Sequence, residues 1–166
     1  QHIYKSRRAR FAQSLGADGI AIIPTASEKR RNRDSDFQYR FDSYFFYLTG
    51  FTEPNALLVI TGDGGSTLFC APKDQEREIW DGYRLGPAMA PNILGVDAAF
   101  SYEELDQNIP KMLENKSLVS YPFAIHVGLE TRVSQWLNKV RARVRFCLLY
   151  TSDAADDLLC VYLGGR

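Results

Sequence analysis

The sequence has few histidines, few cysteines and no net charge, and each shortage argues against a class of function. Its 166 residues include two histidines and three cysteines, and its 20 basic residues equal its 20 acidic residues. Zinc sites need His and Cys at close spacing, and neither such a cluster nor an H-E-x-x-H motif is present. The balanced charge gives no electrostatic reason to expect nucleic acid or an anionic membrane as a partner. No apolar run approaches the ~20 residues that span a bilayer.

Motifs for nucleophilic catalysis and phosphate binding are also missing. No Gly-x-Ser-x-Gly motif occurs, which argues against a serine hydrolase. The Gly-rich stretch Thr61–Gly65 lacks the Gly-Lys-Ser/Thr ending of a phosphate-binding loop, and it predicts a hairpin turn between two strands. Cys70 and His126 both lie in apolar runs, where we expect a buried small side chain and a structural histidine. Without a C-x-x-C pair, the cysteines indicate a reducing, cytoplasmic compartment.

The hydrophobic pattern predicts an α/β fold, a mixed β-sheet flanked by helices. The expected helices are Tyr4–Leu15, Pro87–Leu94, Ser101–Glu114 and Thr131–Val140. The expected strands are Asp18–Pro24, Tyr44–Thr49, Ala56–Ile60, Ser66–Ala71, Glu78–Gly82 and Leu118–Tyr121.

Three details of the helices follow from single residues. Ser101 and Glu104 form a capping box at the start of the third helix. Pro110 interrupts the same helix and is expected to kink it. The arginines of the first helix, Arg7, Arg8 and Arg10, are expected to form a solvated face.

The stretch from Arg30 to Pro54, RRNRDSDFQYRFDSYFFYLTGFTEP, is the most informative part of the sequence. Arg and Asp are concentrated near its start, an aromatic run follows, and a predicted turn, Thr49–Pro54, closes it. Its acids, Asp34, Asp36 and Asp42, are candidates for a hard-cation site. Ion pairing with Arg33 and Arg40 is the simpler expectation. We therefore place no metal site on this chain.

Three blocks of the sequence, Arg30–Pro54, Glu78–Pro87 and Ala90–Asp97, resemble the N-terminal domain of aminopeptidase P, the non-catalytic part of Xaa-Pro aminopeptidases. The resemblance implies the creatinase/aminopeptidase P N-terminal fold with its ribonuclease H-like motif. It also implies a parent metallopeptidase that releases the N-terminal residue before a proline. In such enzymes a C-terminal domain of the pita-bread fold binds two manganese ions, so we expect no cofactor on this chain and no activity from it alone.

The same resemblance suggests partners and two candidate substrate-binding residues. The partners are the C-terminal pita-bread domain, neighbouring subunits of an oligomer, and a peptide substrate with proline at its second position. Asp34 is a candidate to meet the amino end of the substrate or a basic partner. Trp80 is a candidate to cover the substrate as a rigid apolar lid. The alternatives are that Asp34 pairs with an arginine and that Trp80 belongs to the core.

Other parents with this architecture remain open. A prolidase or a creatinase-like hydrolase has a similar N-terminal domain, and a catalytically inactive homologue would use it only for oligomerisation or binding. The run from Trp80 to Pro87 favours the aminopeptidase. One residue departs from the family pattern, because Tyr44 stands where the family usually has Asp.

Both ends of the sequence suggest a truncated domain. The sequence lacks an initiator methionine, so we expect it to begin inside a longer reading frame. Residues 147–166, CLLYTSDAADDLLCVYLGGR, resemble translated sequencing adapter. The expected natural domain is therefore residues 1–146, followed by an artefact tail at 147–166.

Overall fold

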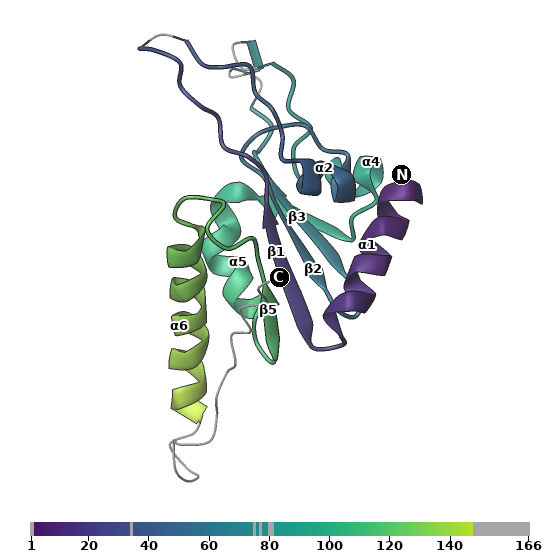
Figure 1. Cartoon of the computed structure of the whole chain (residues 1–166), viewed down its shortest axis with the longest axis vertical. Helices are drawn as coiled ribbons and strands as arrows, with labels where there is room; N and C mark the ends of the chain where they lie inside the picture. Colours follow the sequence, from purple (N-terminus) through teal and green to yellow (C-terminus); the bar gives the residue numbers. More distant parts are fainter. Residues whose placement is uncertain (1, 34, 75, 77, 80–81, 148–166) are drawn as a thin grey trace.

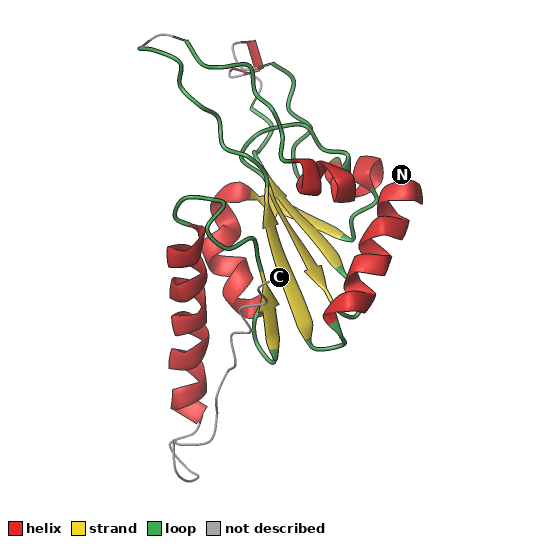
Figure 2. Cartoon of the chain, in the orientation of Figure 1, coloured by secondary structure: helices red, strands yellow, loops and turns green. Residues whose placement is uncertain are grey.

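A five-stranded mixed sheet, in the order β4-β3-β2-β1-β5, lies between two groups of helices (Figures 1 and 2). The computed structural model describes residues 2–33, 35–74, 76, 78–79 and 82–147, with side chains described as far as Arg143. The strands are β1 Gly19–Pro24, β2 Leu57–Thr61, β3 Ser66–Cys70, β4 Ala98–Ser101 and β5 Leu118–Ser120. The predicted α/β class is confirmed, although β4 was not predicted.

The sheet combines antiparallel and parallel pairs. β2 is antiparallel to both β1 and β3, whereas β4 is parallel to β3 and β5 is parallel to β1. The predicted hairpin between β2 and β3 is confirmed, and the Thr61 N–H donates to the Gly65 carbonyl at 2.9 Å. Four strands therefore run in one direction and only β2 runs against them.

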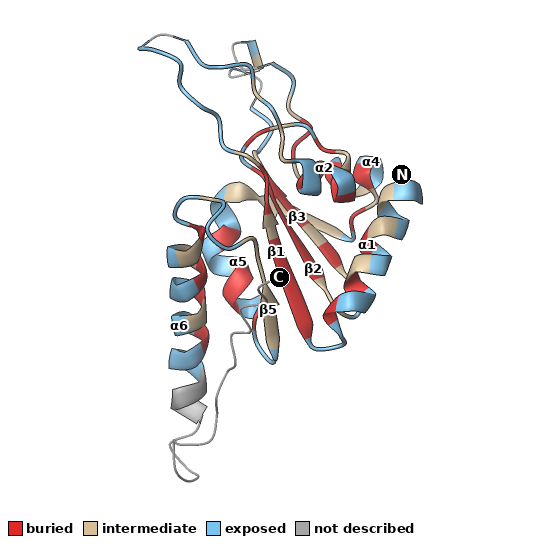
Figure 3. Ribbon diagram, viewed as in Figure 1, coloured by how far each residue is buried: buried red, intermediate tan, exposed pale blue. Residues whose placement is uncertain are grey.

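The helices pack on the sheet as two layers. The helices are α1 His2–Leu15, α2 Ser43–Thr49, α4 Ala90–Leu94, α5 Leu105–Met112 and α6 Leu129–Cys147, with a 3₁₀ turn, η1, at Tyr102–Glu104. Side chains of α1, α2 and α4 share one buried cluster with one face of the sheet, here called the α1 face. Those of α5 and α6 share a second cluster with the opposite face, the α6 face. Burial is therefore highest along β1, β2 and β3 (Figure 3).

Several local predictions hold within these layers. The Ser101–Glu104 capping box is present as predicted. Pro110 lies inside α5, which continues past it to Met112. Gly95 ends α4 in the left-handed conformation, at φ 64°. Cys70 is fully buried in β3, and burial raises the pKa of its thiol to about 12. That thiol is therefore a packing group and not a nucleophile at neutral pH.

The prediction of a strand at Tyr44–Thr49 is wrong, because this segment forms helix α2. The Asp42 carboxylate accepts the N–H groups of Tyr44 and Phe45, both at 2.9 Å, and so caps the first turn. Gly50 ends the helix with φ 70°. The buried residues Phe45, Leu48 and Thr49 have helical spacing. The two helix caps and the burial of Phe45 and Leu48 in the core thus outweigh the β-propensity of the aromatic run.

The strand predicted at Glu78–Gly82 is also wrong where the structure describes it. Glu76, Glu78 and Ile79 are helical. The amides of Glu78 and Gly82 each donate to the carbonyl four residues earlier, at 2.9 and 3.1 Å. These bonds satisfy the backbone locally, so the segment needs no strand partner.

Arg8 contradicts the expected solvated face of α1, because it is only 2% exposed. Its guanidinium donates to the carbonyl oxygens of Leu48 at 2.9 Å, Leu94 at 3.3 Å and Gly95. Those carbonyls end α2 and α4, so a single cation satisfies the ends of two helices. Burial lowers the pKa of Arg8, and the nearby Asp97 opposes that shift.

Candidate functional site

Two loops, residues 26–41 and 71–87, extend beyond the same end of the sheet (Figure 1). The sequence placed both candidate substrate-binding residues on these loops. Asp34 and Trp80 lie outside the described residues, so their side chains are not placed. What the structure does describe is how each loop is held at its base.

The 26–41 loop is a hairpin-like arm with a hydrogen-bonded tip. Arg30 and Asp36 pair as an antiparallel bridge, and the Phe37 N–H donates to the Lys29 carbonyl at 2.9 Å. At the tip, the Asn32 side-chain oxygen accepts the Ser35 N–H at 2.9 Å and its hydroxyl at 2.8 Å. These bonds give the loop a defined backbone path.

The expected ion pairs within this loop are not found among its described residues. Neither Asp36 nor Asp42 lies within ion-pair distance of Arg33 or Arg40. Asp42 accepts backbone N–H groups at the start of α2 instead. Helix capping satisfies this carboxylate without immobilising an arginine side chain.

Tyr39 fixes the base of the first loop. Its hydroxyl lies 2.8 Å from the Thr25 hydroxyl and donates to the Ala26 carbonyl at 3.1 Å. Burial raises the pKa of Tyr39, so the phenol stays protonated and able to donate at neutral pH. The loop is thereby attached to the end of β1.

Glu53 fixes the base of the second loop. Its Oε1 accepts the backbone N–H of Leu85 at 2.9 Å. Its Oε2 is buried and has no hydrogen-bond partner among the described residues. Burial raises the pKa of this carboxyl, and the Leu85 N–H and the Arg84 charge partly oppose the shift. Glu53 thus retains acceptor capacity inside the domain.

Close contacts also hold the neck of the second loop. Glu78 accepts the Arg84 N–H at 3.1 Å, and the Lys73 ammonium lies 3.9 Å from the same carboxylate. Gly86 has φ +71°, and a Cβ there would lie 3.0 Å from the Lys73 Cβ. Only glycine fits this crossing without displacing its neighbour.

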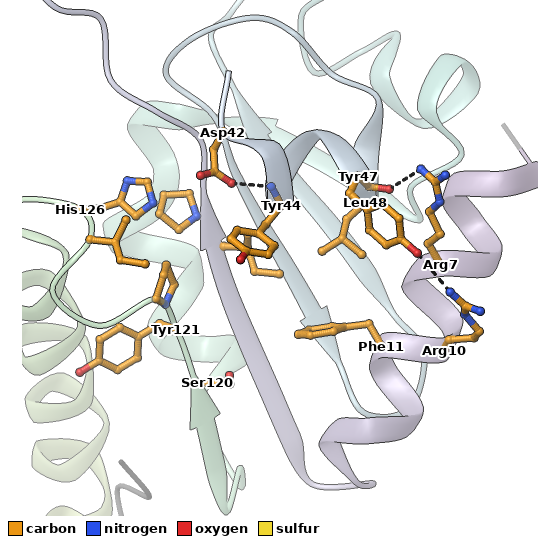
Figure 4. A pocket seen from close by; sticks show the side chains of 14 residues that line it. Arg7, Arg10, Phe11, Asp42, Tyr44, Tyr47, Leu48, Ser120, Tyr121 and His126 are labelled. Atoms are coloured by element: carbon orange, nitrogen blue, oxygen red, sulfur yellow. Dashed lines mark hydrogen bonds between the residues drawn. The ribbon is translucent and has the colours of Figure 1, made fainter. Parts of the chain in front are cut away.

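A groove of about 540 Å³ opens on the α1 face (Figure 4). It lies between α1 and α2 on one side and the segment that follows β5 on the other. Its apolar lining includes Phe11, Ile23, Leu48, Tyr121 and Ile125. A groove of this size and character is suited to an apolar side chain or polypeptide segment.

Charged and polar side chains surround the groove. The Arg7 guanidinium donates to the Tyr47 carbonyl at 3.0 Å and lies 4.1 Å from the centre of the Tyr47 ring. Arg10 donates to the Tyr47 hydroxyl at 3.1 Å. Asp42 and the half-buried His126 complete the rim. His126, which the sequence assigned to a structural role, thus lines a solvent-accessible groove.

Among the described residues, no group of three or more His, Cys, Asp or Glu side chains is arranged to bind a metal ion. None of the described helices is both long and apolar enough to cross a membrane.

Comparison with known proteins assigns the fold to a family. The family model "Aminopeptidase P, N-terminal domain" matches residues 4–120. The chain belongs to the aminopeptidase P N-terminal domain family. It is 37% identical over 135 residues to the Xaa-Pro aminopeptidase of Haemophilus influenzae, covering 80% of this chain and 31% of the relative. Over 142 residues it is 34% identical to the Escherichia coli Xaa-Pro aminopeptidase, covering 83% of this chain and 32% of the relative.

Solved structures agree with this assignment. Zinc-substituted E. coli aminopeptidase P in complex with product superposes with a TM-score of 0.83 at 34% identity, over 88% of this chain and 34% of that one. Pseudomonas aeruginosa aminopeptidase PepP gives a TM-score of 0.79 at 36% identity, over 86% of this chain and 33% of that one. This aminopeptidase P N-terminal domain therefore spans about a third of the length of these relatives.

Sequence reasoning did not identify the residues whose contacts hold the loops and helix ends in place. Glu53 lies in the predicted turn Thr49–Pro54, and Leu85 in the second family-like block, but neither pattern shows that they meet. The signal available for Glu53 was an acid placed directly before Pro54 and a buried strand. Arg8 gave no signal, because an arginine on an amphipathic helix usually faces solvent.

Proposed function

We propose that this chain is the N-terminal domain of an Xaa-Pro aminopeptidase, a hydrolase that releases an N-terminal residue preceding proline. The observation that carries the proposal is the family match over residues 4–120, which coincides with superposition on E. coli aminopeptidase P at a TM-score of 0.83. In this proposal the hydrolytic chemistry belongs to a further domain of the longer protein. The two manganese ions that the family resemblance implies are assigned to that domain too.

The contribution of this domain is proposed to be structural support for the active site. Two loops held by Tyr39 and Glu53 extend from one end of the sheet, and they carry the proposed substrate contacts Asp34 and Trp80. Loops on a rigid scaffold commonly supply such contacts. The proposal includes contact with neighbouring subunits and a peptide substrate with proline at its second position. The cytoplasm is the proposed location, consistent with the free, buried Cys70.

The test compares the 166-residue chain with the full-length protein expressed from the complete reading frame. With manganese and an Xaa-Pro peptide, the full-length protein is expected to release the first residue and the chain alone to release none. In the full-length protein, Trp80→Ala should raise KM more than it lowers kcat, because it removes substrate contact and leaves the metal centre intact. Glu103→Ala, at an exposed residue of η1, is the control.

Turnover by the isolated chain would contradict the assignment of the chemistry to another domain. A full-length protein that binds manganese and leaves Xaa-Pro peptides uncut would overturn the proposed activity. Unchanged kinetics in the Trp80→Ala and Asp34→Asn variants would remove those two residues from the proposal and leave the rest in place.

A further inference from the structure

The turn between α2 and β2 reaches the bases of both loops through one residue, Glu53. Its backbone carbonyl lies 3.5 Å from the Tyr39 hydroxyl, at the base of the 26–41 loop. Its side chain accepts the Leu85 N–H at 2.9 Å, at the base of the 71–87 loop. Both loops extend beyond the same end of the sheet (Figure 1). Glu53 therefore links the two loops to each other as well as to the sheet.

The turn that carries Glu53 is itself held on both sides. Before it, the Phe51 N–H donates to the Thr49 hydroxyl at 3.0 Å, and after it the Ala56 carbonyl accepts the Thr25 N–H at 3.0 Å. Phe51 and Ala56 are buried in the core of the α1 face. A side chain on a backbone that is fixed in this way can set the position of the group it binds.

The group that Glu53 binds belongs to the neck of the second loop. Leu85 is buried in the same core cluster. The next residue, Gly86, passes so close to the other strand of the neck that a Cβ on it would lie 3.0 Å from the Lys73 Cβ. Because the two strands of the neck are in contact, a shift of the Leu85 backbone displaces the neck as a whole.

An acid at this position is unfavourable for folding. The Oε2 atom of Glu53 is buried and has no hydrogen-bond partner among the described residues. Burial raises the pKa of both Glu53 and Tyr39, and the charge of Arg84 opposes both shifts, so the guanidinium lies near both side chains. Buried polar atoms without a partner reduce stability, and they are found disproportionately at functional sites. This cost indicates that Glu53 does more than stabilise the fold.

We propose that Glu53 is a positioning residue for peptide hydrolysis, because its contacts with Tyr39 and Leu85 fix where the two loops stand relative to each other. This inference rests on the proposed function, since it takes the two loops to supply the substrate contacts. Glu53 acts through the Leu85 backbone and not by touching the substrate. Its loss therefore weakens substrate binding and leaves the chemical step, which belongs to another domain, nearly unchanged.

The experiment measures kcat and KM of the full-length protein with manganese and an Xaa-Pro peptide. Glu53→Asp keeps the charge but shortens the side chain by one methylene, so KM should rise about tenfold with kcat within about twofold. Glu53→Gln keeps the length and an acceptor oxygen, and its KM should stay within about twofold of the native value. Arg8→Ala is the control for general destabilisation, because its bonds lie at the ends of α2 and α4. It should lower the folded fraction, and with it the apparent kcat, at an unchanged KM.

Tyr39→Phe tests the other end of the link. It removes the hydroxyl that lies beside the Glu53 carbonyl and is expected to raise KM about threefold. This variant decides the question even if Glu53→Asp fails to fold, because it removes a single oxygen atom. Hydrogen–deuterium exchange provides a readout that does not depend on activity. The Leu85 amide should exchange faster in Glu53→Asp than in Glu53→Gln.

Three results would overturn the inference alone while hydrolysis by the native protein persists. The first is an unchanged KM in Glu53→Asp or in Tyr39→Phe. The second is a raised KM in Glu53→Gln with a normal KM in Glu53→Asp, which would assign the effect to charge and not to position. The third is an equal rise of KM in Arg8→Ala. A native full-length protein that leaves Xaa-Pro peptides uncut would instead overturn the proposed function, and this inference with it.

Discussion

The Glu53 carboxylate accepts the backbone N–H of Leu85 at 2.9 Å, across 32 residues of sequence. This bond joins the turn before β2 to the base of the 71–87 loop. It also joins two of the sequence blocks by which the family is recognised, Arg30–Pro54 and Glu78–Pro87. Residues that carry the resemblance are therefore in direct contact, and the contact sets where the second loop leaves the domain.

Removal of the Glu53 carboxylate should destabilise the domain. In Glu53→Ala the buried Leu85 N–H loses its acceptor, so the free energy of unfolding is expected to fall by about 1–3 kcal/mol. Glu53→Gln keeps an acceptor oxygen and should stay within about 1 kcal/mol of the native protein at low pH. Urea unfolding followed by circular dichroism measures both variants. Equal losses in the two variants would show that the hydrogen bond is not the cause.

The raised pKa of Glu53 predicts a pH dependence with a defined sign. The folded protein holds this proton more tightly than the unfolded chain, whose glutamate has an ordinary pKa of 4.5. The resulting stabilisation is complete below pH 4.5 and is lost as the pH rises through the raised folded pKa. Relative to the native protein, Glu53→Gln should therefore gain stability as the pH increases from 4.5 to the raised folded pKa, and the difference should level off above it. A stability difference that stays constant between about pH 4 and about pH 8 would contradict this expectation.

Arg8 should contribute far more to stability than its neighbours on α1. Arg8→Ala leaves the ends of α2 and α4 without their shared donor, and we expect a loss of about 2–4 kcal/mol. Arg8→Lys should recover only part of this, because an ammonium cannot reproduce the fork of a guanidinium. Arg10→Ala, which removes one exposed bond to Tyr47, is the control and should cost about 0.5 kcal/mol. Thermal unfolding ranks the three variants, and similar losses for Arg8→Ala and Arg10→Ala would refute the role assigned to Arg8.

Gly86 and Gly16 form a matched pair for testing the neck of the second loop. Both have positive φ, +71° and +75°, but only Gly86 has a close neighbour, Lys73. Gly16→Ala should lose about 1–2 kcal/mol from backbone strain alone. Gly86→Ala adds a steric contact at 3.0 Å and should lose more. Chemical denaturation of both variants tests the difference, and an equal loss would show that the backbone around Lys73 shifts at no measurable cost.

Most core elements of the fold were predictable because their signals are local. The apolar runs of β1, β2 and β3 and the capping box at Ser101 depend on residues close together in sequence. A strand was wrongly predicted at Tyr44–Thr49 because aromatic residues favour strands and both faces of the expected strand are apolar. Its helix depends on a cap from Asp42 and on burial of Phe45 and Leu48 against the sheet, and only the second of these needs the folded domain.

The sequence alone was enough to identify the family and the α/β class, and it shows no recognisable catalytic motif. Motifs and hydrophobic periodicity depend only on residues close together in sequence. Tertiary structure decided that Glu53 meets Leu85, that Arg8 is buried at two helix ends, and that a groove remains open beside β5. The bonds of Glu53 and Arg8 join residues between 32 and 87 positions apart. Such pairings depend on how the layers pack, and no local pattern along the chain specifies them.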